Sequence, residues 1–274
     1  MTNTYLDFIT DEDLFECIEE LYKGYQKALI SKDIKSFFNQ RVDPIKFIFD
    51  SKIQNISMEE YIGKEILRQT DKAISNYIGT FHEDLLGKVQ GYNRLAVGGG
   101  IDIISDDGLI VAEIKNKHNT VKGENHPEIF KKLEKFIDSE NPDSAGYYVK
   151  IIDKKSQNEK WVFTSDKKKY KYDNEQIHQI SGDKFYELVT GDPLAFAKLC
   201  SILPSALNDY INSLPEQEVI KVEDATVVEE LKNLTGLENP KDSDLLTTIF
   251  KTNFSTYDGF NDFKIVPNKN DDPK

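Results

Sequence analysis

Residues 98–120 of the 274-residue chain read GGGIDIISDDGLIVAEIKNKHNT, and this stretch decides the fold. Two apolar segments, Ile101 to Ser105 and Leu109 to Lys117, are separated by Asp106-Asp107-Gly108. An Asp-Gly turn between apolar runs is a strong signal for a β-hairpin. The stretch therefore predicts two antiparallel strands joined by a tight turn.

Each of the two predicted strands carries a carboxylate among apolar neighbours. Asp102 stands among three isoleucines, and Glu113 lies in the apolar run LIVAEI. A charged group in a hydrophobic strand is unfavourable unless it is paired or binds a metal. Because side chains alternate along a strand, Lys115 and Lys117 share one face with Glu113. The hairpin is therefore the first place to look for a site.

This combination of residues suits metal-assisted hydrolysis of a phosphodiester. Two carboxylates on adjacent strands repel each other, and a hard divalent cation with oxygen ligands relieves that repulsion. A lysine two residues further on can orient or deprotonate a metal-bound water, or stabilise charge on a phosphoryl oxygen. A structural alternative is also open, in which Glu113 pairs with Lys115 or with another lysine at a sheet edge.

The sequence around the hairpin predicts many helices and a few more strands. Helices are expected at 11–30, 33–39, 45–52, 57–87, 126–139, 182–189 and 192–212, with two short acidic ones within 224–252. Strands are expected at 146–152, near 160–164 and at 176–181. The order strand, helix, strand implies a mixed sheet with helices packed on it.

We therefore expect an α/β (α+β) fold with a central mixed β-sheet flanked by helices. The main domain is assigned to residues 1–212, with a helical N-terminal part (1–56) and a catalytic core (57–212). Residues 213–274 are expected to form a small acidic C-terminal extension, reached through a linker at 215–223.

The predicted helix over 57–87 begins with a capping box, in which Glu60 follows Ser57 by three residues. On a helical wheel, one stripe is apolar and the opposite stripe is polar. The apolar stripe is Leu67, Ile74, Ile78, Phe81 and Leu85, and the polar stripe is Glu65, Gln69, Lys72, Asn76 and Glu83. A buried face and a solvated face explain this pattern, but a mixed polar stripe also suits a metal site or a phosphate backbone.

Charge is distributed unevenly along the chain. The formal net charge of −13 argues against a nucleic-acid partner, because phosphate contacts need Lys and Arg. Residues 111–171, however, carry 14 basic and 10 acidic side chains, whereas the segments on either side are acidic. A protein that touches a polyanion in one cleft and repels it elsewhere would show this distribution. Charge therefore permits DNA as a partner without requiring it.

The composition argues against several other classes of protein. The longest apolar runs fall far short of the roughly 18–20 residues that span a bilayer, and the acidic N-terminal stretch shows no secretory signal. We therefore expect a cytoplasmic protein with no membrane partner. Cys17 and Cys200 are too few for a disulfide framework or a Cys-based zinc site. No Walker motif is present, so ATP dependence is not expected.

At the hairpin the sequence resembles the PD-(D/E)xK nuclease superfamily, whose hairpin supplies an Asp and then Glu-x-Lys. Asp102, Glu113 and Lys115 match that pattern, whereas the Pro of the name is replaced by Ile101. The resemblance implies the central sheet of such nucleases.

The closer resemblance is to Type II restriction endonucleases that cut GGNCC or GGWCC sites, and it covers roughly residues 5–210. It rests on E-x-x-R-Q-x-x-K-x-x-x-N at Glu65, Arg68, Gln69, Lys72 and Asn76, on Phe81-His82, on EIKNKHNT at 113–120 and on ISGDKFYELVTG at 180–191. The eight-residue run that begins at Glu113 is specific.

The resemblance implies a role for each matching residue. The Mg²⁺ ligands would be Asp102, Glu113 and the backbone carbonyl of Ile114, and the catalytic lysine would be Lys115. Superfamily members often add a catalytic acid from the preceding helix. Glu65 matches the group pattern and is the first choice, whereas Glu83 is nearer to Asp102 in sequence and stays open as the alternative. The DNA contacts would be Lys117, Asn119, Thr120 and Lys122 after the strand, and Arg68, Gln69, Lys72 and Asn76 on the helix.

The implied function is that of a Type II restriction endonuclease in a restriction-modification system. Such an enzyme would cut double-stranded DNA at a short GGNCC-like palindrome with Mg²⁺, or with Mn²⁺ in its place, and leave 5′-phosphate and 3′-hydroxyl ends. A palindrome cut on both strands matches two-fold symmetry, so a homodimer is expected. Two alternatives stay open: a repair or junction-resolving nuclease of the same fold, and a catalytically inactive DNA-binding module.

Overall fold

The computed structural model describes residues 3–30, 33–96, 100–117, 125–165, 170–215, 227–253 and 263–264. Its helices are α1 (Asp11–Leu29), α2 (Ile34–Asn39), α3 (Pro44–Ile53), α4 (Met58–Gly87), α5 (His126–Ser139), α6 (Gly182–Thr190), α7 (Ala195–Ser213), α8 (Val227–Leu234) and α9 (Asp242–Asn253). Its strands are β1 (Tyr92–Arg94), β2 (Ile103–Ser105), β3 (Ile110–Lys117), β4 (Ala145–Ile152), β5 (Asn158–Lys160), β6 (Phe163–Thr164), β7 (Lys171–Tyr172) and β8 (Ile177–Ser181). No described helix is both long and apolar enough to span a bilayer.

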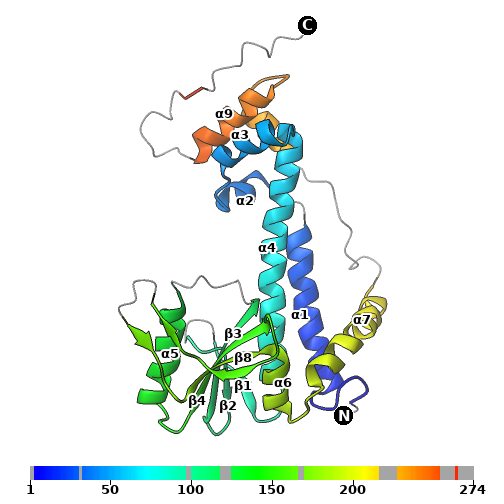
Figure 1. The fold of residues 1–274 in the computed structure, drawn as a ribbon. Coiled ribbons are helices and arrows are strands. Elements are labelled where there is room, and N and C mark those ends of the chain that lie inside the picture. Colours follow the sequence, from blue (N-terminus) through cyan, green and yellow to red (C-terminus); the bar gives the residue numbers. More distant parts are fainter. Residues whose placement is uncertain are drawn as a thin grey trace. The chain divides into compact units, whose positions relative to one another are not determined.

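The central sheet has six strands in the order β1-β2-β3-β4-β8-β5. β2 pairs antiparallel with both β1 and β3, whereas β3, β4 and β8 are parallel. β5 pairs antiparallel with β8, and β6 with β7 forms a separate two-stranded sheet. A mixed sheet with helices beside it confirms the expected α/β (α+β) class (Figure 1).

β2 and β3 form the predicted hairpin. Ile103 of β2 lies opposite Ala112 of β3 in antiparallel register. Gly108 in the turn has a φ of +70°, a conformation that residues with a Cβ rarely adopt. The carboxylate of Asp107 braces the turn by accepting a hydrogen bond from the Leu109 N–H at 3.0 Å. The local sequence signal was therefore sufficient for this element.

Helices cover both faces of the central sheet. α5 packs against β3 and β4 on one face, where Val111 and Trp161 are buried. On the other face α6, α7, part of α1 and the end of α4 enclose a second apolar core (Figure 1). Because side chains alternate, β3 turns Val111 and Glu113 toward the α5 face and Ala112 and Ile114 toward the other. Glu113 thus lies on the face where α5 can reach it.

The chain divides into two compact units. Unit 1 is Met1–Gly24 with Ser75–Val219, and it holds the central sheet. Unit 2 is Tyr25–Ile74 with Ile220–Lys274, so α1 and α4 contribute residues to both units. This division differs from the expected one, in which residues 1–212 form one domain and residues from 213 an extension.

Two segments far apart in the sequence build the core of unit 2. One segment supplies α2, α3 and the start of α4, and the other supplies α8 and α9. The buried apolar side chains are Phe37, Val42, Phe47, Met58, Tyr61 and Ile62 from the first and Val227, Leu231, Leu245, Leu246, Ile249 and Phe250 from the second. Neither set is large enough to make a core alone, and this explains why boundaries drawn along the sequence differ from the observed ones.

The first half of α4 departs from the helical-wheel prediction. Leu67 is 68% exposed, whereas Glu65 and Gln69 of the expected polar stripe are 6% and 2% exposed. Near the end of the helix the prediction is confirmed, because Phe81 and Leu85 are buried in unit 1. The two ends of α4 belong to different units, and each end buries side chains in the core of its own unit. A single apolar stripe along the helix therefore does not describe both ends.

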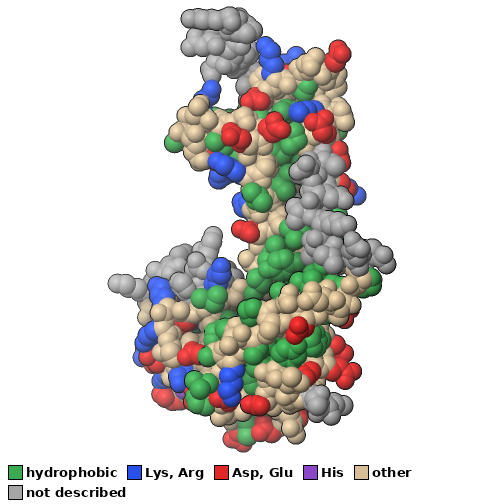
Figure 2. Space-filling view, turned by 90° about the vertical axis from the view of Figure 1, so that its right-hand side faces the viewer, with side chains coloured by type: hydrophobic (Ala, Val, Ile, Leu, Met, Phe, Trp, Pro, Cys, Tyr) green, Lys and Arg blue, Asp and Glu red, His purple; other side chains and the backbone are tan. Residues whose placement is uncertain are grey.

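Basic and acidic side chains are interspersed on the face that Figure 2 shows. Several lysines of the basic segment 111–171 pair with acids of the same unit, among them Lys155 with Glu159 and Lys160 with Asp173. These ion pairs compensate part of the surplus of lysines in this segment.

Candidate active site

The hairpin places two carboxylates side by side on the α5 face of the sheet. Asp102 directly precedes β2, and its N–H donates to the carbonyl oxygen of Ala112 at 2.8 Å. This bond extends the hairpin ladder and sets Asp102 beside Glu113 of β3. The Ile114 N–H donates to Asp102 Oδ2 at 2.7 Å, so the carboxylate has a defined orientation.

Lys115 adds a positive charge to these oxygens. Its Nζ lies 2.7 Å from Glu113 Oε1, 2.8 Å from the carbonyl oxygen of Ile114 and 3.9 Å from Asp102 Oδ2. Two carboxylates and one backbone carbonyl therefore converge on a single cationic group. The structure brings together the four residues that the hairpin and its resemblance singled out.

A pocket of about 360 Å³ includes both carboxylates in its wall. Three more charged side chains line it: Glu83 of α4, Arg94 of β1 and Lys132 of α5. Acids and cations from four elements thus face one cavity in unit 1. A cavity of this kind can hold a metal ion and an anionic substrate group together.

Glu83 is the helix acid that reaches this pocket. Arg94 Nη2 donates to Glu83 Oε2 at 3.0 Å, and the same guanidinium also binds Asp84. α4 comes this close to β1 because residue 87 is glycine, where a Cβ would lie 2.6 Å from Arg94 Cβ. Arg94 therefore holds the Glu83 carboxylate at the edge of the cluster.

Glu65, the helix acid that the sequence favoured, does not line the pocket. It lies in unit 2, where it is 6% exposed and accepts hydrogen bonds from Arg68 and Gln69. Its oxygens are engaged within its own helix. The assignment of Glu65 as a catalytic acid finds no support in this geometry, and Glu83 is the helix acid found with Asp102.

Burial and like charge raise the pKa of both Glu113 and Glu83. Burial is the larger cause for each carboxyl, and the negative charge of Asp102 is the second. Lys115 opposes the rise at Glu113, and Arg94 opposes it at Glu83. A raised carboxyl pKa means that the surroundings disfavour the ionised form, and a divalent cation among these oxygens would relieve that penalty.

The donor set of the hairpin suits a hard cation. Carboxylate and carbonyl oxygens are the ligands that Mg²⁺ prefers in proteins. Over the ranges that the structure describes, no group of three or more His, Cys, Asp and Glu side chains is arranged to hold a metal. A metal here would be held by Asp102, Glu113 and the Ile114 carbonyl, with the other positions left to water and substrate oxygens.

Of the side chains expected to contact DNA, the structure describes those from α4 and β3. Lys117 is exposed at the end of β3, Lys72 and Asn76 are exposed on α4, and the side chain of Arg68 is 49% exposed. Asn119, Thr120 and Lys122 lie outside the described residues.

Gln69 departs from the expectation that it contacts DNA. It is 2% exposed, and its amide donates to Glu65 Oε1 at 3.0 Å and to the carbonyl oxygen of Phe37 at 3.1 Å. In this conformation Gln69 ties α4 to α2 and supports Glu65, so it does not face a ligand. The helical-wheel pattern does not predict the burial of Gln69, because that burial depends on packing within unit 2.

Two cations at the site were not singled out from the sequence. Arg94 and Lys132 line the pocket. Neither stands in a motif, and each reaches the site only through strand pairing or helix packing.

Comparisons with known proteins show which families and enzymes the chain is similar to. The family model described as Eco47II restriction endonuclease matches residues 6–212. The Type II restriction enzyme Sau96I of Staphylococcus aureus is 45% identical over 219 residues, which cover 78% of this chain and 84% of that enzyme. The Type II restriction enzyme Eco47II of Escherichia coli is 36% identical over 214 residues, which cover 76% of this chain and 88% of that enzyme.

Proposed function

Because the chain belongs to the Eco47II restriction endonuclease family, we propose that it hydrolyses double-stranded DNA at a short GGNCC-like palindrome with Mg²⁺. The family match spans residues 6–212, and both similar enzymes are Type II restriction enzymes. The chain is therefore a Type II restriction endonuclease, that is, a site-specific deoxyribonuclease. The metal, the palindrome and the chemistry of the cut ends are the proposed part.

One observation carries this proposal: Glu113 Oε1, the Ile114 carbonyl oxygen and Asp102 Oδ2 converge on one cationic group. When bound there, Mg²⁺, or Mn²⁺ in its place, supplies a Lewis acid for the scissile phosphate and for the attacking water. The hairpin holds the oxygens of Asp102 and Glu113 in place, and the Lys115 ammonium would move away from them to admit the cation.

Lys115 is proposed to act on the attacking water and on the phosphate. Its ammonium can donate a hydrogen bond to that water or to a phosphoryl oxygen on which negative charge develops. Water attacks phosphorus in line, the P–O3′ bond breaks, and the 3′ oxygen leaves and takes up a proton. The products then carry 5′-phosphate and 3′-hydroxyl ends.

Glu83 is our choice for the additional acid from the helix. It lines the pocket that contains Asp102 and Glu113, and Arg94 holds its carboxylate at 3.0 Å. Its pKa is raised first by burial and then by the charge of Asp102, and this interaction with Asp102 supports the choice. Glu83 would orient water at the cation rather than bind the DNA.

The two strands of a palindrome are related by two-fold symmetry, so we propose that the enzyme acts as a homodimer. Contacts with the DNA backbone are proposed for Lys117, Lys72 and Asn76, which are exposed, and for Asn119, Thr120 and Lys122. Backbone contacts fix the register of a protein on DNA but do not by themselves read its sequence.

The test is to incubate the purified protein with unmethylated phage DNA and Mg²⁺ and to map the fragment ends. Asp102→Ala and Lys115→Ala should abolish cutting, because they remove a cation ligand and the lysine beside it. Lys155→Ala is the matched control, since Lys155 pairs with Glu159 on the surface of the same unit. Discrete fragments that end in a GGNCC-like sequence, from wild type and control alone, are the expected result.

Each alternative gives a different outcome in the same experiment. Cleavage of branched DNA but not of linear duplex would identify a repair or junction-resolving nuclease. Specific binding of duplex without any cleavage in Mg²⁺ or Mn²⁺ would identify an inactive DNA-binding module. Cutting that survives Asp102→Ala would contradict the proposed site while leaving the family assignment intact.

A further inference from the structure

Glu65 of unit 2 is buried as deeply as Glu113 of the active site, and each residue is 6% exposed. Glu65 has no part in the chemistry proposed above. A buried carboxylate is unfavourable unless its oxygens are well bonded, and an ordinary ion pair between helix neighbours adds little stability. Stability alone therefore does not explain why the acid is buried while its partner Arg68 keeps 49% of its side chain exposed.

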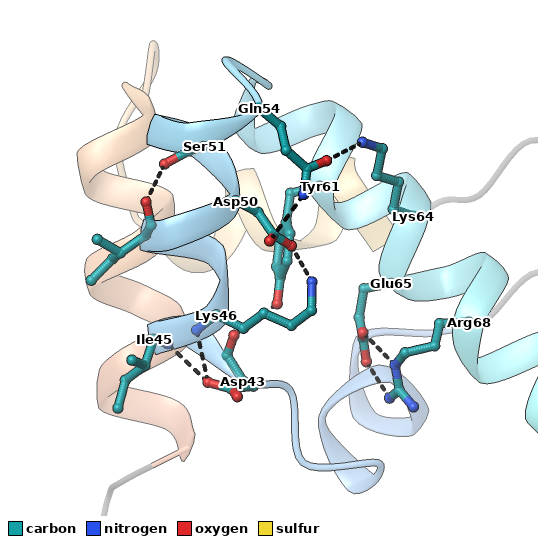
Figure 3. Close-up of polar contacts among 11 residues, drawn as sticks. Asp43, Ile45, Lys46, Asp50, Ser51, Gln54, Tyr61, Lys64, Glu65 and Arg68 are labelled. Carbon is teal, nitrogen blue, oxygen red and sulfur yellow. Dashed lines mark hydrogen bonds and ion pairs between the residues drawn. The ribbon is translucent and has the colours of Figure 1, made fainter.

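The contacts of Glu65 form a rigid support for one guanidinium. Arg68 Nε donates to Glu65 Oε2 at 2.7 Å, and Arg68 Nη2 donates to Glu65 Oε1 at 2.6 Å. Figure 3 shows the two side chains paired through both bonds. Gln69 donates to the same carboxylate at 3.0 Å and to the Phe37 carbonyl at 3.1 Å, which ties the acid to α2.

The paired guanidinium keeps unused donors on its outer side. An arginine has five N–H groups in one plane, and Glu65 takes two of them, so three remain. Two of the remaining groups lie on the edge between Nη1 and Nη2 and point in parallel. Arg68 makes no other hydrogen bond within the described ranges, and this edge is available to a ligand with two adjacent acceptors.

We infer that Arg68 reads a guanine of the DNA target through its O6 and N7 acceptors, and that Glu65 is the positioning residue that holds the guanidinium for this contact. Arginine with guanine is the commonest specific pairing in the major groove, because the fork of donors matches the two acceptors. The inference rests on the proposed function, since it requires duplex DNA as the substrate.

The local charge favours a base over a phosphate as the ligand. Glu65 compensates the charge of Arg68, and Asp50 compensates that of the neighbouring Lys46 (Figure 3). A phosphate contact gains most from an uncompensated positive charge. A compensated guanidinium keeps its directional donors but attracts the DNA backbone weakly, which is the combination that sequence reading requires.

The experiment measures the affinity for DNA and the discrimination between the cleavage sequence and other duplexes. The full-length protein is titrated, with Ca²⁺ in place of Mg²⁺ to prevent cutting, into a fluorescent duplex that carries the mapped cleavage sequence. The comparison duplexes are an unrelated sequence and the cleavage sequence with 7-deazaguanine, which lacks N7, at one guanine at a time. Arg68→Ala, Arg68→Lys and Glu65→Gln are compared with Lys232→Ala. Lys232 forms an exposed pair with Glu229 at the same helical spacing and in the same unit, so it is the matched control.

Arg68→Ala and Arg68→Lys should each lose about 10- to 100-fold in affinity for the cleavage sequence and almost nothing for the unrelated duplex. At one guanine, replacement by 7-deazaguanine should weaken DNA binding by the wild type. The same replacement should not weaken DNA binding by Arg68→Ala any further, because both changes remove the same contact. Glu65→Gln should lose discrimination and bind the unrelated duplex more tightly, since it leaves the arginine charge uncompensated. Lys232→Ala should match wild type.

Two results would overturn the inference while the proposed function stands. An equal loss of affinity for all duplexes in Arg68→Ala would mean a phosphate contact, and a lower melting temperature with unchanged discrimination would mean a structural pair. If Arg68→Ala does not fold because it leaves Glu65 unpaired, the double variant Glu65→Gln with Arg68→Ala gives the same readout without a buried charge. Wild type that binds no duplex would refute the proposed function itself, a failure distinct from unchanged discrimination in a cutting enzyme.

Discussion

At the scale of single residues, Glu113 is placed for chemistry at the expense of stability. It is 6% exposed, and burial followed by the charge of Asp102 raises its pKa above the ordinary 4.5. An acid whose pKa is raised on folding destabilises the folded chain once the pH is high enough to ionise it. At a pH below the unfolded pKa the group is protonated in both states and this penalty is absent.

Glu113→Gln should therefore separate activity from stability. Cleavage should fall by about 100-fold or more, because a cation ligand is lost. The melting temperature at pH 7.5 should be no lower than that of wild type, and any gain should vanish as the pH falls to about 4. Fragment mapping and thermal unfolding monitored by circular dichroism measure the two effects, with the exposed Glu159→Gln as a control. A large loss of stability at neutral pH would contradict this view of the site.

Lys132 is expected to contribute a phosphate contact, because it lines the active-site pocket beside three acids. Lys132→Ala should raise KM for DNA by about tenfold and reduce the salt dependence of binding by about one charge. The adjacent Lys131 is exposed on the same helix and does not line the pocket, so Lys131→Ala should behave like wild type. Equal effects of the two variants on KM and salt dependence would contradict a phosphate contact by Lys132.

At the scale of elements, the contact between α4 and β1 decides which acid joins the hairpin. A Cβ at residue 87 would lie 2.6 Å from Arg94 Cβ and 2.7 Å from Arg94 N, so any side chain there must push the helix and the strand apart. Separation would withdraw Arg94 from Glu83. The lack of a side chain at residue 87 thus allows Arg94 to hold the carboxylate of Glu83, four residues earlier in the chain.

Gly87→Ala should destabilise the protein by about 1–3 kcal/mol and raise the Mg²⁺ concentration needed for half-maximal cutting. Gly63→Ala on the same helix is the matched control, because nothing lies within 4 Å of a Cβ at that position. The control should be neutral or more stable by up to about 1 kcal/mol. Urea unfolding and Mg²⁺ titration of the cleavage rate measure both. An unchanged Mg²⁺ requirement in Gly87→Ala would argue against Glu83 as the helix acid.

Elements with local signals were predicted closely from the sequence. The hairpin follows from the Asp-Gly turn, and α5 was expected at 126–139 and observed at His126–Ser139. The helix over 57–87 was also predicted, but its buried face was not. A turn or a helix depends on neighbours a few residues away, whereas the burial of Glu65 and Gln69 depends on α2 and on the rest of unit 2.

At the scale of the whole molecule, the C-terminal helices are part of a shared core. Leu231 of α8 is fully buried together with Phe37 and Phe47 of the N-terminal segment. The family match ends at residue 212, so this half of the unit 2 core lies beyond the matched region. Removing the C-terminal helices would expose the apolar faces of α2 and α3.

Leu231→Ala should destabilise unit 2 by about 2–5 kcal/mol, because it leaves a cavity in a closed core. Leu234 lies on the same helix and is 54% exposed, so Leu234→Ala should change stability by less than about 0.5 kcal/mol. Hydrogen exchange should show faster exchange in α2 and α3 for the first variant only. Unchanged exchange in those helices would mean that the C-terminal segment folds apart from them.

The sequence by itself determined the mixed α/β class, the hairpin, the pairing of Asp102 with Glu113 and Lys115, and the family, because each depends on residues close together in the chain or on a specific run of them. The tertiary structure decided what depends on distant contacts. It placed Glu83 rather than Glu65 at the pocket, added Arg94 and Lys132, buried Gln69 and joined the two segments of unit 2. The physical reason is that a periodic pattern gives the face of a helix but not the partner which that face meets, and the partner decides whether a polar side chain is buried, paired or free to bind.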